Sequence, residues 1–362
     1  MNIKKITSFL LLSLLLISSL FVNPTFAQES IVNTIGNDNQ KLEGIKIEDI
    51  DNYPDVKEII KEKGFQHLLE TGTEKDEFLY DHLNLAQPEA ASMFEDLDQE
   101  RLSEIAEKLG LQMPGEQKPE VIVDEFFLVK YKDNTREIVD NIWYLTYSAD
   151  DYGFKIGLVN IGFDKIDSIT GTVDMYKKSG RNWVFGGKKA VSKFQAGNGT
   201  VDTWNFSKSN VSDYFEYNLT VTEDGQTWTY SNKKDNKYQY QRYNFAFGPY
   251  SSMSASGGER HHLISQDALN KSGFNSNSAP ALRMLAEDHA KTPNWGNSTA
   301  SNTFREKEKT LLKQKKYEDL IQLEVDAFKN ISDPEGKSKN LAVKYNDYLV
   351  LCAYSYYNYF GI

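Results

Sequence analysis

The chain has 362 residues, with 41 Lys and Arg against 52 Asp and Glu, which gives a formal net charge of −11. This length is sufficient for two or three domains, and the acidic balance excludes a protein whose whole surface attracts polyanions. The single cysteine, Cys352, excludes an internal disulfide.

Residues 1–27 have the pattern of a secretory signal peptide. Lys4 and Lys5 precede an apolar run, and Thr25-Phe26-Ala27 forms a small-x-small cleavage sequence. The run is shorter than the roughly 20 apolar residues that cross a bilayer. We therefore expect cleavage before Gln28, a secreted, extracellular protein and no stable membrane anchor.

The segment 28–118 is predicted to be an acidic helical region. Between residues 28 and 120 there are 23 acidic and 9 basic residues, a net charge of −14. Apolar residues recur at three- and four-residue steps over 55–69 and 98–109, which predicts two helices. Residues 28–52 are expected to be irregular. His67 and His82 are predicted to be structural or surface residues.

From residue 119 to 248 the apolar pattern changes to two-residue alternation, separated by turn-rich stretches. Eight or nine short strands at this spacing predict an antiparallel β-sandwich. Its many Tyr and Trp residues fit either the core and edges of the sandwich or a ligand-binding face. Both interpretations remain open at this point.

A Gly- and Ser-rich stretch, residues 249–257, is predicted to be a flexible linker and a domain boundary. The terminal module, 258–362, is expected to contain a short strand at Leu263-Ile264, a helix over 280–289 and a long helix over 303–331. An apolar aromatic element over 348–360 is expected to pack on this module. Together these expectations describe an α+β multidomain protein.

Three of the five histidines, His261, His262 and His289, lie within 29 residues of each other in the terminal module. Adjacent side chains on a strand point to opposite faces. One histidine of the pair can therefore hold a metal while the other faces a substrate. A short cluster of this kind also occurs by accident, so the surrounding residues decide its meaning.

Those residues are Glu259-Arg260-His261-His262-Leu263-Ile264, then Ala279-Pro280-Ala281-Leu282-Arg283-Met284, Asp288-His289-Ala290-Lys291-Thr292, Trp295-Gly296 and Phe304-Arg305. Residues 257–332, about a fifth of the chain, resemble the HNH-type (His-Me finger, ββα-metal) nuclease modules of bacterial polymorphic toxins. The similarity is to the branch with a paired-histidine motif. No family resemblance covers residues 28–256.

The resemblance implies that His261 and His289 are metal ligands, that His262 is the general base, and that Arg305 contributes to catalysis. Two departures from the family pattern limit this transfer. Pro293 stands where colicin-like members have a further histidine, so Asp288, water or substrate phosphate would complete the coordination. Ile264-Ser265 also replaces a frequent proline. Imidazole ligands suit Zn²⁺, Ni²⁺ or Co²⁺, and water-rich sites of this type also use Mg²⁺ or Mn²⁺.

Nucleic-acid contacts are expected from Arg260 and from a basic stripe, Lys309, Lys313 and Lys316, spaced at helical steps. Interleaved glutamates make a solvated charged helix an equal alternative for the stripe. The net charge of +1 over residues 257–362, from 14 basic and 13 acidic residues, argues against tight nonspecific DNA binding.

These observations predict a secreted, metal-dependent nuclease that hydrolyses DNA or RNA, and a toxin is one role that fits it. A toxin would require an immunity protein as partner. The alternative is a secreted surface- or glycan-binding β-sandwich protein with a non-catalytic terminal module. A metallopeptidase is disfavoured because the chain has no His-Glu-x-x-His sequence.

Overall fold

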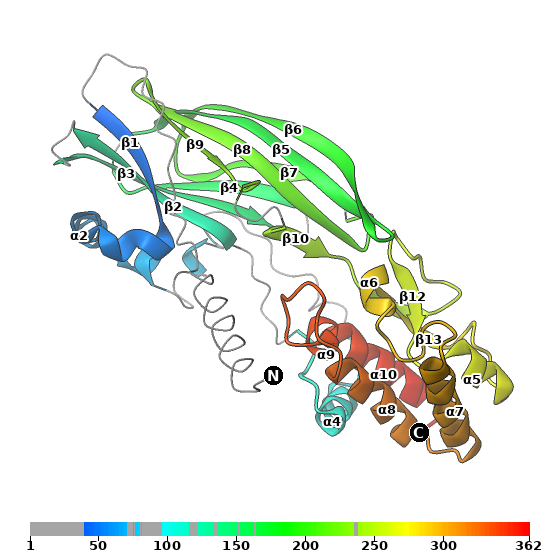
Figure 1. Cartoon of the computed structure of the whole chain (residues 1–362). Helices are drawn as coiled ribbons and strands as arrows, with labels where there is room; N and C mark the ends of the chain where they lie inside the picture. Colours follow the sequence, from blue (N-terminus) through cyan, green and yellow to red (C-terminus); the bar gives the residue numbers. More distant parts are fainter. Residues whose placement is uncertain are drawn as a thin grey trace, which may run out of the picture. The chain divides into compact units, whose positions relative to one another are not determined.

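Figure 1 shows the computed structural model of the chain. The signal-peptide prediction and His82 lie outside the residues that the structure describes, and all described residues belong to the compact unit Thr34–Ile362. The described residues are 40–70, 75, 77–79, 81, 96–115, 122–132, 137–150, 153–162, 164–206, 208–234 and 238–362.

Sheet A has five antiparallel strands in the order β1-β2-β3-β4-β7. Its strands are β1 (Gln40–Lys46), β2 (Ile122–Lys132), β3 (Glu137–Ala149), β4 (Gly153–Asn160) and β7 (Gly199–Asn205). The sequence analysis expected residues 28–52 to be irregular, and this is wrong for β1, which pairs with β2 along its whole length.

Sheet B has four antiparallel strands in the order β10-β8-β5-β6, and β9 pairs with β8 beside them. Its strands are β5 (Ile166–Ser179), β6 (Asn182–Ala196), β8 (Ser212–Glu223), β9 (Gln226–Ser231) and β10 (Tyr240–Tyr243). Strand β6 has a neighbour only on its β5 side in this sheet.

Sheets A and B enclose one hydrophobic core. Alternate residues of each sheet point into it, so that Trp143 and Phe154 of sheet A join Phe215 and Leu219 of sheet B. All four side chains are fully buried. The removal of large aromatic side chains from water is the main force that holds the two sheets together. Antiparallel sheets combined with separate helices confirm the expected α+β class.

The other face of sheet A is covered by a second core cluster, to which the first helices contribute Val56, Ile60 and Leu68. These elements are η1 (Ile47–Asn52), α2 (Pro54–Glu62) and η2 (Gln66–Leu69). The helical prediction for residues 55–69 therefore holds for most of its length. His67 lies in η2, where its ring contacts Phe78 at 4.4 Å between centroids.

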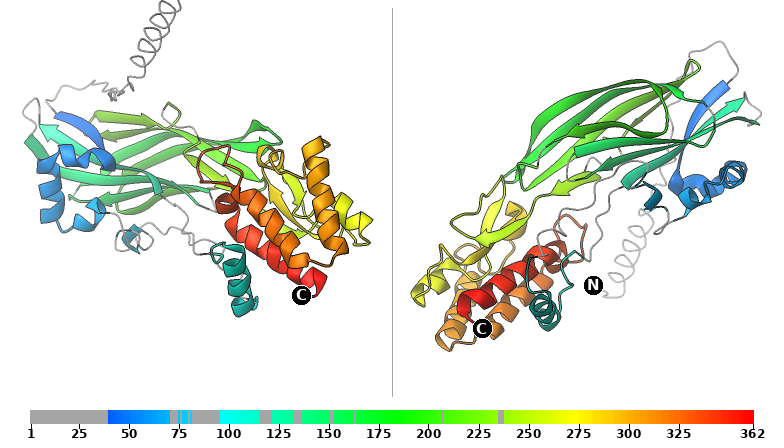
Figure 2. Two further views of the ribbon diagram at one scale, coloured as in Figure 1. Left: turned by 60° about the horizontal axis from the view of Figure 1, so that its bottom comes forward. Right: turned by 180° about the vertical axis from the view of Figure 1, so that it is seen from behind.

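Helix α4 (Gln99–Leu109) ends as expected at Gly110, which adopts the left-handed conformation with φ 61°. The helix does not pack with α2. Its Ile105 and Leu109 belong instead to the core of the C-terminal elements, and Leu102 and Ala106 contact Val350 and Leu351. Figure 2 shows α4 beside α10 in both views. The acidic N-terminal region thus divides between two cores.

The C-terminal elements are built around sheet C, which has the order β11-β13-β12 and antiparallel pairing. The bounds are β11 (Ala246–Pro249), β12 (Glu259–His262), α5 (Gln266–Lys271), β13 (Pro280–Met284), α6 (Ala286–His289), α7 (Thr299–Lys313), α8 (Tyr317–Lys329), α9 (Leu341–Lys344) and α10 (Asn346–Phe360). The paired histidines lie on β12, just before the predicted strand at Leu263-Ile264.

Two expected helices differ from the structure. Residues 280–284 form a strand that pairs with both neighbours, and only 286–289 are helical. The predicted long helix over 303–331 is two helices, because Lys315 has φ 56°, a left-handed conformation that interrupts an α-helix. The C-terminal aromatic element, left open as helix or strand, is the helix α10.

Residues 249–257 are not an unsupported linker. They connect β11 to β12, which lie in one sheet. The Tyr250 and Ser251 amides donate to Ala279 and Asn277, and the carbonyls of Ser256 and Gly257 accept from Val211 and Gly180. Bonds on both sides fix this segment. Among the described residues, none of the helices is both long and apolar enough to cross a membrane.

Candidate functional site

Strand β12 positions the paired histidines. In the antiparallel pairing of β12 with β13, His261 lies opposite Leu282 and His262 lies opposite Ala281. The two side chains point to opposite faces, as alternation requires. The His261 side chain is only 1 % exposed, and its ring lies 4.8 Å from the His289 ring and 5.6 Å from the Phe328 ring between centroids.

His289, the last residue of α6, is held by Glu259. Its Nδ1 lies 2.5 Å from Glu259 Oε2. Glu259 and His261 are two residues apart on β12, so they share a face, and His289 contacts both. A carboxylate only accepts hydrogen bonds when ionised, so Nδ1 carries the proton and Nε2 keeps its lone pair in the neutral ring. Glu259 is an orienting residue that the sequence pattern did not indicate.

All three histidines are held in the neutral form. Burial lowers the pKa of His261 well below its usual range, and the nearby His289 and His262 act in the same direction. Burial also lowers the pKa of His289, although Glu259 opposes this shift. Burial lowers the pKa of His262 as well, although the hydrogen bond to the Ser276 carbonyl opposes it. A neutral imidazole is the form that binds a metal or accepts a proton.

The Nε2 atom of His261 is buried and has no hydrogen-bond partner among the described residues. A buried polar atom without a partner costs about 1–3 kcal/mol, so most are satisfied. Next to the Glu259-oriented His289, this atom is suited to be a metal ligand. Carboxylate–histidine pairs of this kind are the usual support of a ligand imidazole.

His262 lies on the other face of β12 with its tautomer fixed. Its Nε2 is 2.9 Å from the Ser276 carbonyl oxygen. Because a carbonyl only accepts, Nε2 donates and Nδ1 is the basic nitrogen of the neutral ring. The ring stacks on Tyr250 at 3.9 Å between centroids with an interplanar angle of 17°. This environment orients a base.

Arg260 contacts the same tyrosine. Its guanidinium carbon lies 4.2 Å from the Tyr250 ring centroid, and Nη1 donates to the Tyr250 carbonyl at 2.9 Å. The arginine therefore helps to hold the ring on which His262 stacks. Since its side chain is only half-buried, it also keeps access to solvent.

Asp288 is next to His289 in sequence but has other partners. Its fully buried carboxylate accepts from the Tyr345 hydroxyl at 2.7 Å and pairs with Lys344 at 2.9 Å. Lys344 also contacts Asp333 at 2.8 Å and Glu335 at 2.6 Å. In the described part of the chain, no group of three or more His, Cys, Asp or Glu could hold a metal. Asp288 is thus not brought together with His261 and His289 as a third ligand.

Arg305, on α7, holds the loop that follows His289. Its Nη1 donates to the carbonyls of Asn294 at 2.8 Å and Gly296 at 2.7 Å. Asn294 in turn donates to the Leu263 carbonyl at 3.1 Å, directly after the paired histidines. The loop is thereby fixed to the end of β12. It displays Trp295, whose side chain is 42 % exposed.

The three lysines of the predicted basic stripe are not equivalent. Lys309 is buried between Asp267 at 2.6 Å and Glu306 at 2.7 Å, and these hydrogen bonds raise its pKa. Lys313 is exposed near the end of α7. Lys316 lies beyond the break at Lys315 and is 3.9 Å from Asp319. A continuous stripe on one helix is therefore not formed.

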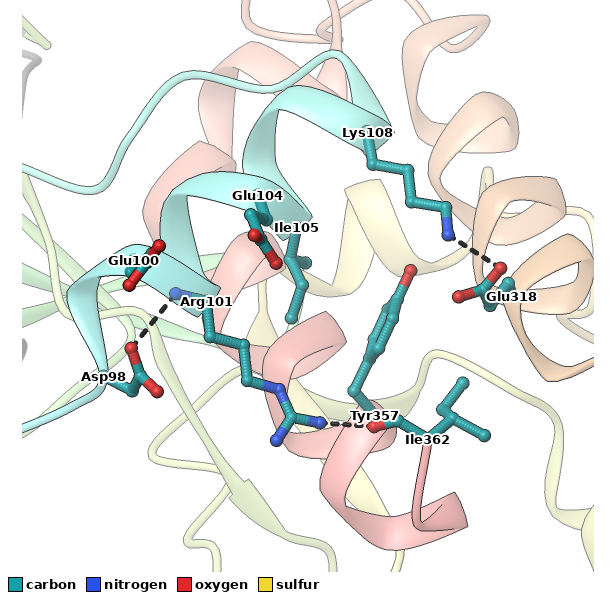
Figure 3. A pocket seen from close by; sticks show the side chains of 9 residues that line it. All are labelled: Asp98, Glu100, Arg101, Glu104, Ile105, Lys108, Glu318, Tyr357 and Ile362. Atoms are coloured by element: carbon teal, nitrogen blue, oxygen red, sulfur yellow. Dashed lines mark hydrogen bonds and ion pairs between the residues drawn. The ribbon is translucent and has the colours of Figure 1, made fainter.

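A cavity of about 490 Å³ lies away from these residues, between α4 and the end of α10 (Figure 3). Among its lining groups, Arg101 donates to the Ile362 carbonyl, and Lys108 pairs with Glu318 at 2.7 Å. None of the predicted site residues lines it. The lining residues are Asp98, Glu100, Arg101, Glu104, Ile105, Lys108, Glu318, Tyr357 and Ile362.

The candidate site therefore consists of His261, His262 and His289, with Glu259 and Ser276 as orienting groups. Comparisons of the chain with protein-family models, curated proteins and solved structures find no match.

Proposed function

We propose that residues 258–362 are an HNH-type nuclease module and that the protein hydrolyses phosphodiester bonds of nucleic acid with a divalent metal ion. The observation that carries this proposal is the chain of contacts from Glu259 through His289 to His261, whose Nε2 is buried without a partner. A histidine with only a structural role in the core would gain no stability from a buried nitrogen without a hydrogen bond.

His261 and His289 would hold the ion as neutral imidazoles, and water and substrate phosphate oxygens would fill the other positions. Zn²⁺, Ni²⁺, Mg²⁺ or Mn²⁺ are the candidates. When bound, the ion supplies stabilisation of the negative charge that develops on the phosphate and the leaving oxygen. Glu259 keeps His289 in the tautomer that leaves Nε2 available.

His262 is the general base in this proposal. The Ser276 carbonyl fixes the proton on Nε2, so Nδ1 takes the proton from the attacking water. Burial keeps the ring neutral near pH 7, and stacking on Tyr250 restricts its rotation. A positioned general base contributes typically about 10²–10⁴ in rate. Arg305 acts in this account by holding the loop next to the site.

We further propose that sheets A and B form a β-sandwich that supports the module, and that the protein is secreted. Release into the medium would expose foreign nucleic acid to the site. If the protein acts as a toxin, the producing cell needs an immunity protein that covers the module.

The test incubates the full chain with plasmid DNA and with total RNA, in EDTA and with each candidate metal. We expect metal-dependent cleavage that His262→Ala reduces by about 10² or more, while its metal affinity stays near the wild-type value. His261→Ala and His289→Ala are expected to lose metal affinity first. His67→Ala, in η2, is the control for loss of an imidazole elsewhere.

The melting temperature of each variant separates loss of activity from loss of fold. Absence of cleavage with every metal contradicts the proposal. Normal cleavage by all three site variants contradicts the assignment of roles, as does loss of metal binding in His262→Ala alone.

A further inference from the structure

The hairpin formed by β5 and β6 is the most basic exposed feature of an acidic chain. Residues 175–196 contain six cationic side chains and no acidic one, whereas the whole chain has a net charge of −11. Lys188 lies 3.3 Å from Asp174 on the neighbouring strand β5, and Arg181 is exposed in the connection between the two strands. The cations are Lys177, Lys178, Arg181, Lys188, Lys189 and Lys193.

Aromatic side chains of this hairpin, with Tyr214 of β8 and Tyr238, lie on the face of sheet B that points away from the core. Tyr176 stacks on Tyr214 at 5.0 Å with an interplanar angle of 8°, and the Trp183 and Tyr238 rings lie 5.8 Å apart at 30°. Phe185 lies 5.8 Å from Tyr176 and is 57 % exposed. We call these five residues the aromatic platform.

The connection between β5 and β6 lies near α6 and β12 (Figure 1). Lys178 Nζ lies 4.7 Å from the Trp183 ring and pairs with Glu287, two residues before His289. The Gly180 amide donates to the Gly257 carbonyl at 2.7 Å, two residues before Glu259. Two direct contacts thus connect the platform with the strand and the helix that carry the histidines.

An exposed ring, Phe185, and the half-buried rings of Tyr176, Trp183 and Tyr238 lie among cations. This surface is complementary to a ligand with flat faces and regularly spaced negative charges. Unpaired nucleotides have both, because their bases are free to stack and their phosphates attract cations. A duplex hides its bases, and a neutral glycan makes no use of six cations. An uncovered aromatic face also carries an aggregation cost, which a binding role explains.

We propose that the aromatic platform binds unpaired nucleotides and leads single-stranded DNA or RNA to His261, His262 and His289. The inference rests on the proposed nuclease function for its purpose. Binding itself is measured separately from cleavage.

The experiment measures fluorescence anisotropy of a labelled single strand of about 12 nucleotides, its duplex, and a neutral oligosaccharide, with the full chain in EDTA. We expect preference for the single strand and loss of affinity with rising salt. Phe185→Ala, with and without Trp183→Leu, should weaken binding by about tenfold or more. Phe194→Ala is the matched control, because Phe194 is 70 % exposed on the same strand but outside the platform.

Hydrolysis of the small diester bis(p-nitrophenyl) phosphate in metal separates the two proposals. This small diester cannot contact the platform and the histidines at the same time. Phe185→Ala should therefore hydrolyse it normally, while His262→Ala should not. Platform-dependent strand binding without any hydrolysis refutes the nuclease function and leaves the platform supported. Unchanged strand binding in both platform variants, or platform-dependent binding of the oligosaccharide in place of the strand, overturns the inference.

Discussion

At the residue scale, the candidate site shows which side-chain positions can be predicted from a sequence and which cannot. Alternation on a strand correctly separates His261 from His262, because it needs only local geometry. The prediction that Asp288 is a third metal ligand is not supported. Successive residues on a helix point about 100° apart, so Asp288 contacts Lys344 while His289 contacts Glu259. Glu259 was missed because its contact depends on the packing of α6 against β12.

Glu259 can be tested without measuring activity. Glu259→Gln keeps an acceptor for His289 Nδ1 but removes the negative charge that makes the imidazole a better ligand. We expect a loss of about 10–100-fold in metal affinity, measured by calorimetric titration. Glu318→Gln, which removes an exposed carboxylate on α8, is the control. Equal affinities for wild type and Glu259→Gln would show that His289 is not a ligand.

A second residue-scale prediction concerns the buried carboxyl pair Glu308 and Glu324. Glu308 accepts from the Ser265 amide at 2.8 Å, at the start of α5, and neighbours Glu324. Burial, reinforced by Glu308, raises the pKa of Glu324 well above its usual range. A carboxyl with a raised folded-state pKa stabilises the fold below its unfolded pKa, about 4.3, and this contribution is lost as pH rises through the folded-state pKa.

Glu324→Gln removes the titration but keeps a donor toward Glu308. We therefore expect its free energy of unfolding to exceed that of wild type by an amount that grows with pH, with a limiting slope of about 1.4 kcal/mol per pH unit. Urea unfolding over a pH series that begins above the unfolded-state pKa of about 4.3 measures it. Asp326→Asn, exposed on the same helix, serves as control. Parallel curves for wild type and Glu324→Gln would contradict the shift.

At the element scale, strong periodicity gave correct elements and short apolar runs did not. The helix predicted over 98–109 is α4, Gln99–Leu109. The run Pro280–Met284 was assigned to a helix because a short apolar segment does not distinguish a buried strand from a helix. Strand β1 was missed because Leu42 and Ile45 point to opposite faces, into different cores, so no two-residue alternation appears.

The same strand shows a requirement that only tertiary structure imposes. A Cβ atom on Gly44 would lie 2.3 Å from Trp228 Cε2. The glycine therefore lets β9 lie close to β1. The aromatic residues of β6 are a second example of a feature that only tertiary structure reveals. The sequence left open whether Tyr and Trp fill the core or form a ligand-binding face, and the arrangement of the strands shows that Trp183 and Phe185 face away from the core.

Arg305 supplies the element-scale prediction. Arg305→Lys keeps the charge but cannot donate to the Asn294 and Gly296 carbonyls in the fork geometry of a guanidinium. We expect faster amide hydrogen exchange over residues 292–298 and a loss of about 1–3 kcal/mol in stability. If the nuclease proposal holds, the cleavage rate also falls. Lys307→Ala, exposed on the same helix, should change neither; unchanged exchange in Arg305→Lys would show that the loop is held by other contacts.

At the scale of the whole molecule, direct hydrogen bonds join segments that were predicted to lie in different domains. Tyr243 of β10 donates to Glu335 at 2.6 Å, and Arg283 of β13 donates to the Asn244 carbonyl at 2.8 Å. The linker prediction failed because Gly and Ser also serve where backbone segments approach closely. At Gly257, a Cβ would lie 2.3 Å from the Lys178 carbonyl oxygen. Composition alone does not separate these two uses.

Helix α4 makes the strongest prediction at this scale, because the next residue of the core that it completes, Val211, lies about 100 residues later in the sequence. Ile105 and Leu109 are each at most 2 % exposed, and their neighbours include buried residues of α8 and α10. Truncating two such side chains costs about 2–5 kcal/mol each. Ile105→Ala with Leu109→Ala should therefore speed amide exchange in α8 and α10 and lower metal affinity, while sheets A and B keep their protection. Leu68→Ala, in the separate core beneath sheet A, should show the reverse pattern. For the same reason, residues 258–362 expressed alone should bind the dye ANS and unfold without a cooperative transition. A stable, cooperatively folding fragment 258–362 would show that α4 is dispensable and that the C-terminal module is independent after all.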